Sequence, residues 1–236
     1  MILLDEVYKI LLRHYGPQGW WPIINLKESK ARYNLKTPRN NKDILEISLG
    51  AILTQSISFF NVEKALLNLK RKNLLSAKKI YEIKTSILAE LIKPSGYYNQ
   101  KAEKIKNFID WFKTYNFSWD TIIKKSLSEL RSELLEIKGI GPETADSILL
   151  YGLNKKIFVI DAYTKRIFTR LKIITENNSY EEIQQYFHAN FKGSYQSYNE
   201  YHALIVEHAK TFCQKKPKCS LCFLSNKCFH KKETIS

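Results

Sequence analysis

Apolar side chains recur at steps of three and four residues along most of the chain, and strict alternation of apolar and polar residues is rare. This spacing is typical of amphipathic helices that bury one face. Asp43–Glu46 and Ser179–Glu182 both fit the capping-box pattern that often begins a helix. We expect helices at about 5–14, 43–57, 61–72, 76–82, 85–92, 99–115, 128–137, 142–152, 162–171, 179–191 and 196–213.

Two segments depart from this pattern. Residues 16–40 hold three of the six prolines and predict a long connection, which in a compact domain is often functional. Ile157–Ile160 is a short apolar run, and we expect it to be an extended lead-in to the next helix. With so few other breakers, the sequence predicts an all-α fold.

Composition adds one hint about partners. The chain has 236 residues, 44% of them hydrophobic, enough to bury a core in one body or two small domains. Its 38 Lys and Arg outnumber 23 Asp and Glu, which gives a formal net charge of +15. Such an excess attracts nucleic acids, although ordinary solvated lysine-rich faces would give the same count.

The first residues carry no targeting signal that the pattern reveals. Met1–Lys9 turns polar after three apolar residues that follow the initial Met, too short a run for a signal peptide or a membrane span. We therefore expect a cytoplasmic protein with no membrane segment.

All four cysteines lie in one short window, as Cys213, Cys219, Cys222 and Cys228. Structural disulfides are uncommon in the cytosol, so this clustering favours a metal centre over four unrelated reduced thiols. Thiolates are soft ligands that select Zn²⁺ or an iron–sulfur cluster, and ligand type alone leaves both open. Lysines interleave the cysteines and would offset the negative charge of such a centre.

The segment Leu134–Ala145 predicts a helix, a tight turn and a second helix. Gly139 and Gly141 permit the turn and let a phosphate approach the backbone, and Pro142 suits the first position of a helix. The start of that helix offers N–H groups and partial positive charge, which suit a phosphate. An ordinary helix corner is the alternative, but an apolar Ile140 between the glycines favours a nucleic-acid-binding hairpin.

Asp161 follows an apolar run and stands before a predicted helix. An N-cap is the simplest role for such an aspartate, and that role is compatible with catalysis.

Aromatic residues gather at two places. Trp20, Trp21 and Pro22 lie together in the proline-rich connection, and Phe59 lies beside Phe60. Flat aromatic faces are what recognition of an unstacked base requires, although core packing explains any one of these residues equally well.

Taken together, these motifs resemble the endonuclease III superfamily of base excision repair glycosylases, over about residues 40–230. The resemblance implies an all-α fold of two helical domains that flank a DNA-binding groove. Residues 40–152 would form a six-helix barrel with a helix-hairpin-helix. Residues 1–39 and 153–236 would form the second domain, with an iron–sulfur cluster loop at 210–230.

Short matches give the resemblance its detail. Leu53–Gln55 is similar to a family segment whose glutamine fills the gap left by a flipped base. Gly96–Ala102 resembles a stretch in which the residue matching Tyr97 wedges into the duplex. Asp161 matches the family's catalytic aspartate. Lys216–Cys222 matches the loop of members that carry a [4Fe-4S] cluster, which makes this cluster the expected cofactor, although the first cysteine spacing is one residue shorter than usual.

The hairpin also departs from the family in one position. Bifunctional members carry a lysine two residues after the second hairpin glycine, where this chain has Glu143. A carboxylate cannot form the Schiff base that strand cleavage requires, so a monofunctional enzyme is expected, although Lys138 and Lys165 are nearby in the sequence. The residues expected to contact DNA are Gln55, Tyr97, Lys138, Gly139, Ile140, Gly141, Glu143 and Thr144.

Within the superfamily, the chain is most similar to bacterial and archaeal 3-methyladenine DNA glycosylases. The resemblance implies a lesion pocket built from the residues that match Trp20, Trp21, Pro22 and Phe59. A cationic alkylated purine suits such a pocket, because aromatic faces attract cations. The expected partner is double-stranded DNA that contains a damaged base, bound by a monomer.

Three alternatives share much of this evidence. A glycosylase for mismatched thymine or uracil, or for adenine, would have the same scaffold and cysteines. A bifunctional glycosylase that also cleaves the strand would differ only in its nucleophile. A non-enzymatic DNA-binding module with structural zinc would use the hairpin for phosphates and Asp161 as a cap alone.

Overall fold

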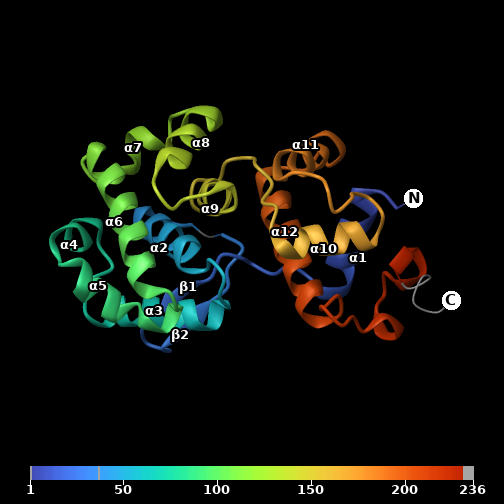
Figure 1. Ribbon diagram of the computed structural model, residues 1–236, viewed down its shortest axis with the longest axis horizontal. Helices are drawn as coiled ribbons and strands as arrows, with labels where there is room; N and C mark the ends of the chain where they lie inside the picture. Colours follow the sequence, from blue (N-terminus) through green and yellow to red (C-terminus); the bar gives the residue numbers. More distant parts are fainter. Residues whose placement is uncertain (1, 37, 231–236) are drawn as a thin grey trace. The chain divides into compact units, whose positions relative to one another are not determined.

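A computed structural model describes residues 2–36 and 38–230 of the chain. Helices dominate it, as the periodicity predicts, and its contacts divide the chain into two compact units (Figure 1). The middle unit spans Trp21–Lys155, and the terminal unit combines Met1–Trp20 with Lys156–Ser236. Each unit buries its own apolar core.

A short antiparallel hairpin occupies part of the segment that the prolines predict as a connection. It consists of β1 (Ile23–Asn25) and β2 (Lys30–Arg32), with Ile24 opposite Ala31. The hairpin packs against α2 (Asn41–Leu53) and α3 (Phe59–Arg71). The sequence alone grouped residues 1–39 with the terminal domain, but from Trp21 onward the chain clusters with the middle unit because β1 packs there.

Helix α2 is the centre of the middle unit. Every residue from Asp43 to Leu53 is buried, and the helix contacts α3, α6, α9 and β1. A helix that is covered on all sides along most of its length is a core element rather than a surface one. Its first residues, Asn41 and Lys42, are exposed, whereas its C-terminal end at Leu53 is buried, so other elements have to supply partners for the carbonyl groups there.

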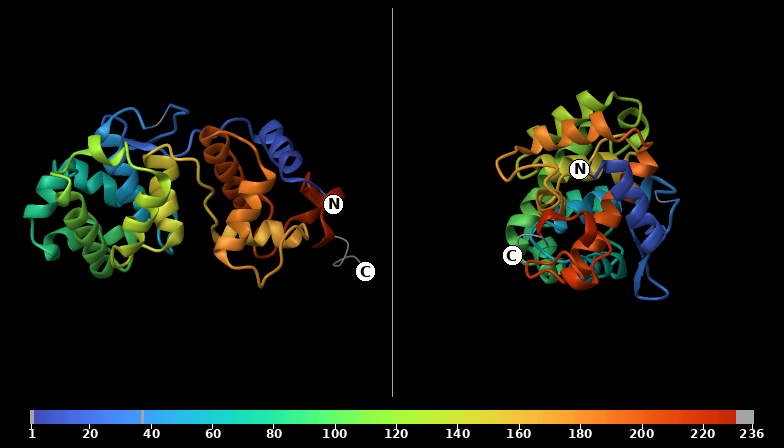
Figure 2. Two further views of the ribbon diagram at one scale, coloured as in Figure 1. Left: turned by 90° about the horizontal axis from the view of Figure 1, so that it is seen from above. Right: turned by 90° about the vertical axis from the view of Figure 1, so that its right-hand side faces the viewer.

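The remaining helices of the middle unit surround α2 (Figures 1 and 2). They are α4 (Ala77–Glu82), α5 (Thr85–Leu91), η1 (Lys93–Ser95), α6 (Tyr98–Thr114), α7 (Trp119–Ile122), α8 (Leu127–Glu136), α9 (Pro142–Ser147) and the π-helical turn η2 (Ile148–Gly152). None of the described helices is both long enough and apolar enough to cross a membrane.

The capping predictions had mixed outcomes. Ser179 and Glu182 form the expected capping box at the start of α11. The box expected at Asp43–Glu46 is wrong, because α2 begins earlier and the Asn40 side chain accepts the first amides instead. Asn40 was a stronger cap because it already precedes the first helical turn.

The terminal unit is built around α12 (Tyr195–Thr211), which packs against α1 (Leu4–Tyr15) and α10 (Ala162–Arg170). Figure 2 shows α1, from the start of the chain, beside α12, from near its end. Helix α11 (Tyr180–Asn190) adds Phe187, whose ring stacks on Phe158 with centroids 4.1 Å apart. The short helices η3 (Cys219–Leu221) and η4 (Ser225–Lys227) carry the cysteine loop.

Candidate functional site

Asp161 is the N-cap of α10 in the terminal unit. Its Oδ1 accepts a hydrogen bond of 2.7 Å from the backbone N–H of Thr164, as an N-cap side chain does. Its other oxygen, Oδ2, lies 3.6 Å from Nε2 of His202 on α12. The side chain is buried, with 9% of the residue exposed. The expected cap is therefore present, and one carboxylate oxygen is not used by it.

The charge of Asp161 is stabilised by these neighbours. Burial alone would raise the pKa of the carboxyl group, but His202 and the N–H of Thr164 outweigh it, and the net pKa is lowered. The carboxylate is therefore ionised near neutral pH although it is buried.

The predicted helix-hairpin-helix is present in the middle unit. Helix α8 ends at Glu136, and the N–H of Ile140 donates to the carbonyl of Ile137 to close the turn. Gly139 has φ +95°, in the region that favours glycine, and Gly141 is the N-cap of α9. Ile140 is 4% exposed and anchors the turn in the core. Lys138 and Glu143 are exposed on either side of it.

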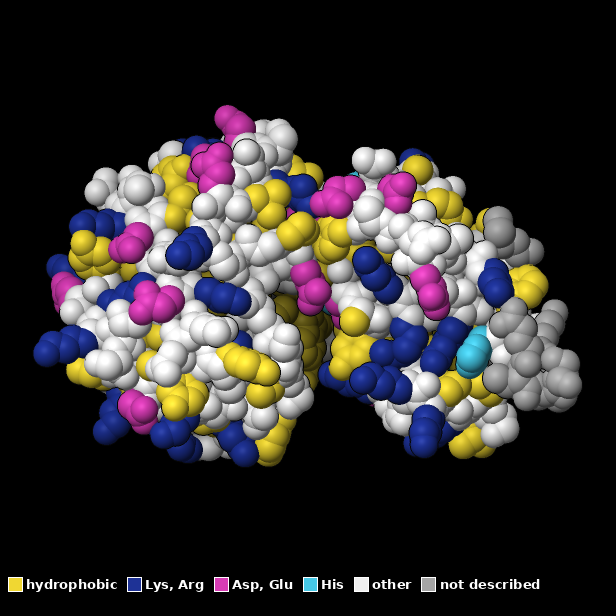
Figure 3. Space-filling model, viewed as in Figure 1, with side chains coloured by type: hydrophobic (Ala, Val, Ile, Leu, Met, Phe, Trp, Pro, Cys, Tyr) yellow, Lys and Arg dark blue, Asp and Glu magenta, His cyan; other side chains and the backbone are white. Residues whose placement is uncertain are grey.

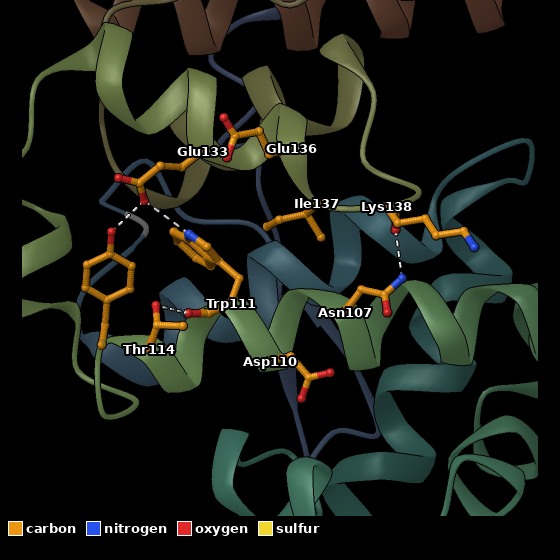
Figure 4. A pocket seen from close by; sticks show the side chains of 9 residues that line it. Asn107, Asp110, Trp111, Thr114, Glu133, Glu136, Ile137 and Lys138 are labelled. Carbon is orange, nitrogen blue, oxygen red and sulfur yellow. Dashed lines mark hydrogen bonds between the residues drawn. The ribbon is translucent and has the colours of Figure 1, made fainter.

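Helix α6 holds the hairpin in place from one side. The Asn107 amide donates 3.0 Å to the Lys138 carbonyl, and Lys104 passes directly over Gly139. Figure 4 shows this region, where Asn107, Trp111 and Glu133 line a groove between α6 and α8. Glu133 accepts hydrogen bonds from Trp111 and Tyr115 there. The hairpin is thus fixed to a long helix by direct polar contacts.

Gln55 lies on the hairpin. Its Nε2 donates 3.2 Å to the Gly139 carbonyl and 3.0 Å to Oγ1 of Thr144, and its Oε1 accepts from Lys104. The structure therefore brings Gln55 against two hairpin residues that lie 84 and 89 positions later in the chain, and the resemblance assigns all three to DNA contact.

Tyr97 combines a highly exposed side chain with an unusual backbone conformation. It is 71% exposed, the largest exposure among the described large hydrophobic residues, and its backbone is left-handed with φ 45°. Such a conformation costs about 1–3 kcal/mol in a residue other than glycine and is found most often at functional sites. Tyr97 is the residue before α6 and directly follows Gly96.

The aromatic pocket residues are divided between the two units. Trp21, 4% exposed, packs its ring against Phe59, with centroids 6.0 Å apart, and Pro22 is buried beside it. Trp20 belongs to the terminal unit, where the Lys210 ammonium lies 5.8 Å from its ring. The middle unit thus gathers Trp21, Pro22 and Phe59.

Two contacts of Trp21 were missed by sequence reasoning. Tyr151 on η2 places its ring 5.4 Å from that of Trp21, and Gly50 on α2 lies directly against the indole. A Cβ at Gly50 would be 3.0 Å from Nε1 of Trp21, so the glycine makes room for the ring. The π-helical turn that carries Tyr151 is a feature often found at functional sites, but no sequence signal announces it.

The four cysteines line one small cavity in the terminal unit, and none forms a disulfide. The Arg170 guanidinium donates 3.2 Å to Cys213 Sγ, and His208 Nε2 lies 3.5 Å from Cys222 Sγ. Burial raises the pKa of Cys222 to about 11. Figure 3 shows Lys and Arg side chains gathered on the visible face of this unit.

The donor set fits a cluster of iron and sulfide. Four thiols line one cavity, and the Arg170 N–H donates to the sulfur of Cys213, as N–H groups commonly do around thiolate-ligated clusters. Within residues 2–36 and 38–230, no three His, Cys, Asp or Glu side chains are grouped as the ligands of a single metal ion would be.

Comparisons with known proteins show the family of the chain. Residues 49–192 match the family described as HhH-GPD superfamily base excision DNA repair protein. A protein of Methanocaldococcus jannaschii, named as a candidate DNA repair glycosylase, is 44% identical over 231 residues, which are 97% of each chain. The crystal structure of the H. pylori 3-methyladenine DNA glycosylase bound to 1,N6-ethenoadenine is 30% identical, with a TM-score of 0.70, over 89% of this chain and 98% of that one.

A third similarity concerns the fold alone. The structure of a non-covalent endonuclease III–DNA complex has a TM-score of 0.75 and 16% identity, over 100% of this chain and 99% of that one.

The hairpin glycines allow a paired test. Gly139→Ala places a Cβ 2.4 Å from Cγ of Lys104 in a left-handed backbone, whereas a Cβ at Gly141 meets nothing within 4 Å. We expect Gly139→Ala to lower the free energy of unfolding by about 1–3 kcal/mol, and Gly141→Ala to change it by less than about 0.5 kcal/mol. Urea denaturation measures both; equal losses would show that the hairpin is not held as described.

Proposed function

The chain belongs to the HhH-GPD superfamily of base excision DNA repair proteins, and we propose that it is a monofunctional DNA glycosylase that releases alkylated purines of the 3-methyladenine type. The observation that carries the proposal is a buried Asp161 whose Oδ1 caps α10 and whose Oδ2 lies 3.6 Å from Nε2 of His202. These neighbours lower the pKa of its carboxyl group. The similarity to the H. pylori enzyme supports the choice of substrate class.

Asp161 would act on the sugar of an everted nucleotide. When the glycosidic bond breaks, its electron pair leaves with the base and positive charge develops on the sugar. The Oδ2 atom, which does not cap α10, would stabilise that charge or orient the attacking water. Electrostatic stabilisation of this kind is stronger at a buried site than in water.

The aromatic residues would bind the base. Alkylation at N3 of adenine makes the ring cationic and weakens its bond to the sugar, so the leaving group needs little acid assistance. A cation over an aromatic face gains about 0.5–2 kcal/mol. We assign this role to Trp21, Pro22 and Phe59 of the middle unit, where the Trp21 ring packs against Phe59 and Tyr151, and to Trp20 of the terminal unit.

The middle unit would grip the duplex. The turn at Gly139–Gly141 and the first amides of α9 suit a backbone phosphate, with Lys138 exposed beside them. We assign Gln55 to the gap that the everted base leaves, and Tyr97 to the wedge. Ile140, the exposed Glu143 and Thr144 belong to the same hairpin, which would contact the DNA.

We propose that Cys213, Cys219, Cys222 and Cys228 hold a [4Fe-4S] cluster. When bound, the cluster supplies a rigid cross-link for the loop after α12. Arg170 would donate to the sulfur of Cys213 while its other N–H groups bond the carbonyls of Gln214 and Lys215. The guanidinium thus brings positive charge to the thiolate and fixes the loop at once.

Release of single lesions from duplex DNA tests the function. We expect the wild-type protein to release 3-methyladenine, and Asp161→Asn to slow single-turnover release by about 100-fold or more. Affinity for DNA should change by less than about threefold, because phosphate contacts dominate it. Release of thymine, uracil or adenine in place of alkylated purines would replace the proposed substrate class, and an active Asp161→Asn would remove the catalytic role.

Position 143 is Glu rather than Lys, which predicts that water and not an amine attacks the sugar. Borohydride reduction traps a Schiff base between protein and DNA, so a water-using enzyme should give no covalent adduct. We expect none from the wild-type protein, measured by gel shift under denaturing conditions. A trapped adduct that is lost in Lys165→Met or Lys138→Met would identify a lyase instead.

Metal analysis tests the cysteine loop. Protein purified without oxygen should be brown and contain iron and inorganic sulfide in equal amounts. We expect Cys219→Ser to lose both, together with the protection of the loop against proteolysis. Bound zinc with no iron or sulfide would contradict the cluster and leave the four thiolates as a zinc site.

A further inference from the structure

Lys101, on the first turn of α6, is a lysine where a core residue would be expected. The residue is 2% exposed, and it follows the same helix face as Ile105 and Phe108, both fully buried. Burial lowers the pKa of Lys101 to about 8, and the charge of Lys104 adds to this effect. A buried ammonium needs hydrogen-bond partners, so its contacts should matter to the fold around it.

Both partners of Lys101 are backbone carbonyls, and each stands directly before a loop that carries a proposed DNA-contacting residue. Its Nζ donates 2.7 Å to the carbonyl of Leu53, the last residue of α2 and two positions before Gln55. It also donates 2.6 Å to the carbonyl of Ser95, two positions before Tyr97. One ammonium therefore joins the loop that leads to Gln55 with the loop that leads to Tyr97.

The two loops also touch each other and share an unusual backbone. Ser56 has φ 59° and Tyr97 has φ 45°, so a residue other than glycine adopts the left-handed conformation in each loop. A Cβ at Gly96 would lie 3.2 Å from Cδ1 of Ile57, which shows how closely they pack. Strained loops keep their shape only when surrounding contacts hold them.

Lys104, one turn further along α6, extends the same arrangement. It bonds Oε1 of Gln55, whose Nε2 is bonded to the hairpin. The start of α6 therefore fixes the backbone before Gln55 through Lys101 and its side chain through Lys104.

We propose that Lys101 is a positioning residue for base eversion, which holds Gln55 and Tyr97 in the relative arrangement needed to enter the duplex together. The inference rests on the proposed function, because it assumes that these two side chains enter DNA. Either loop can move away from the other only by leaving a buried ammonium with one partner lost, which is costly. The two side chains therefore act as one rigid pair.

The chain offers a matched control in Lys106 on the same helix. Its Nζ also bonds backbone carbonyls, those of Ile80, Tyr81 and Ile83 at the end of α4, which belong to neither loop. Lys101→Met and Lys106→Met each remove one ammonium that bonds carbonyls. Because Lys106 is less buried than Lys101, the free energy of unfolding of both variants is measured as well, and a purely structural role would make any loss of eversion follow the loss of stability.

Eversion is measured in an Asp161→Asn background with a duplex that carries 2-aminopurine beside a tetrahydrofuran abasic analogue. We expect the wild-type sequence at position 101 to give a fluorescence increase that Tyr97→Ala abolishes. Lys101→Met should lose most of this increase while Lys106→Met keeps it. In the active protein, Lys101→Met should slow single-turnover release by about 10²-fold, with the dissociation constant for DNA nearly unchanged.

Hydrogen exchange supplies a readout that needs neither DNA nor activity. Amides at 54–57 and 95–98 should exchange faster in Lys101→Met, and those at 80–84 in Lys106→Met. If Lys101→Met does not fold, Ile57→Ala loosens the contact between the loops without removing the ammonium, and should give a smaller loss of fluorescence in the same direction.

Two results would overturn the proposal: equal fluorescence in the Lys101→Met and wild-type proteins, or the same loss of fluorescence in Lys101→Met and Lys106→Met. Failure of the proposed substrate class is distinguishable from both. In that case the wild-type protein releases some other base or none, while the fluorescence and exchange measurements on the abasic duplex still separate Lys101 from Lys106.

Discussion

Backbone carbonyls at buried helix ends need hydrogen-bond donors, and this constraint organises the middle unit. Because α2 is covered on all sides, water cannot meet the need at its end, and long lysine side chains do so instead. Lysines also bond carbonyls at partly exposed helix ends, since Lys106 bonds Ile83 after α4 and Lys155 bonds Ile123 and Lys125. Part of the charge of +15 is therefore used inside the protein rather than offered to DNA.

The same requirement applied to amides explains the site around Asp161. The first N–H groups of α10 need an acceptor, and Asp161 supplies one oxygen to Thr164. A capped carboxylate is held in one orientation and kept ionised, which are also the properties that a catalytic carboxylate needs. His202 faces the second oxygen, so capping and the proposed chemistry use different atoms of the same group.

Most of the helices could be predicted from the sequence, because helical periodicity depends on residues that are close together in the chain. The helix ends could not, because contacts with distant residues determine where a helix stops. Helix α2 was expected to reach residue 57 but ends at Leu53, whose carbonyl Lys101 takes. Glu46 was expected to cap a helix, but it instead accepts the N–H of Ile24 in β1 and pairs with Lys70.

The site shows the same division. Sequence motifs predicted the hairpin glycines, the cap at Asp161 and the clustered cysteines. Tyr151, His202 and Lys104 were missed, because their roles come from contacts across the fold. Lys101 could have been found from the sequence. It lies on the apolar face of a predicted helix with Ile105 and Phe108, and a lysine at such a position needs buried hydrogen-bond acceptors.

The ionisation of Asp161 tests the account most directly. Carbon-13 NMR of the labelled aspartate carboxyl groups, with Asp161→Asn to identify the resonance, follows this group as the pH falls. A lowered folded-state pKa predicts a carboxylate that stays ionised from neutral pH down past about 3.9, the value for an unfolded chain. The stability it contributes would be present above that value and lost as the pH falls through the lower folded-state pKa. A resonance that titrates near neutral pH would show a protonated acid at this position and contradict the proposed role.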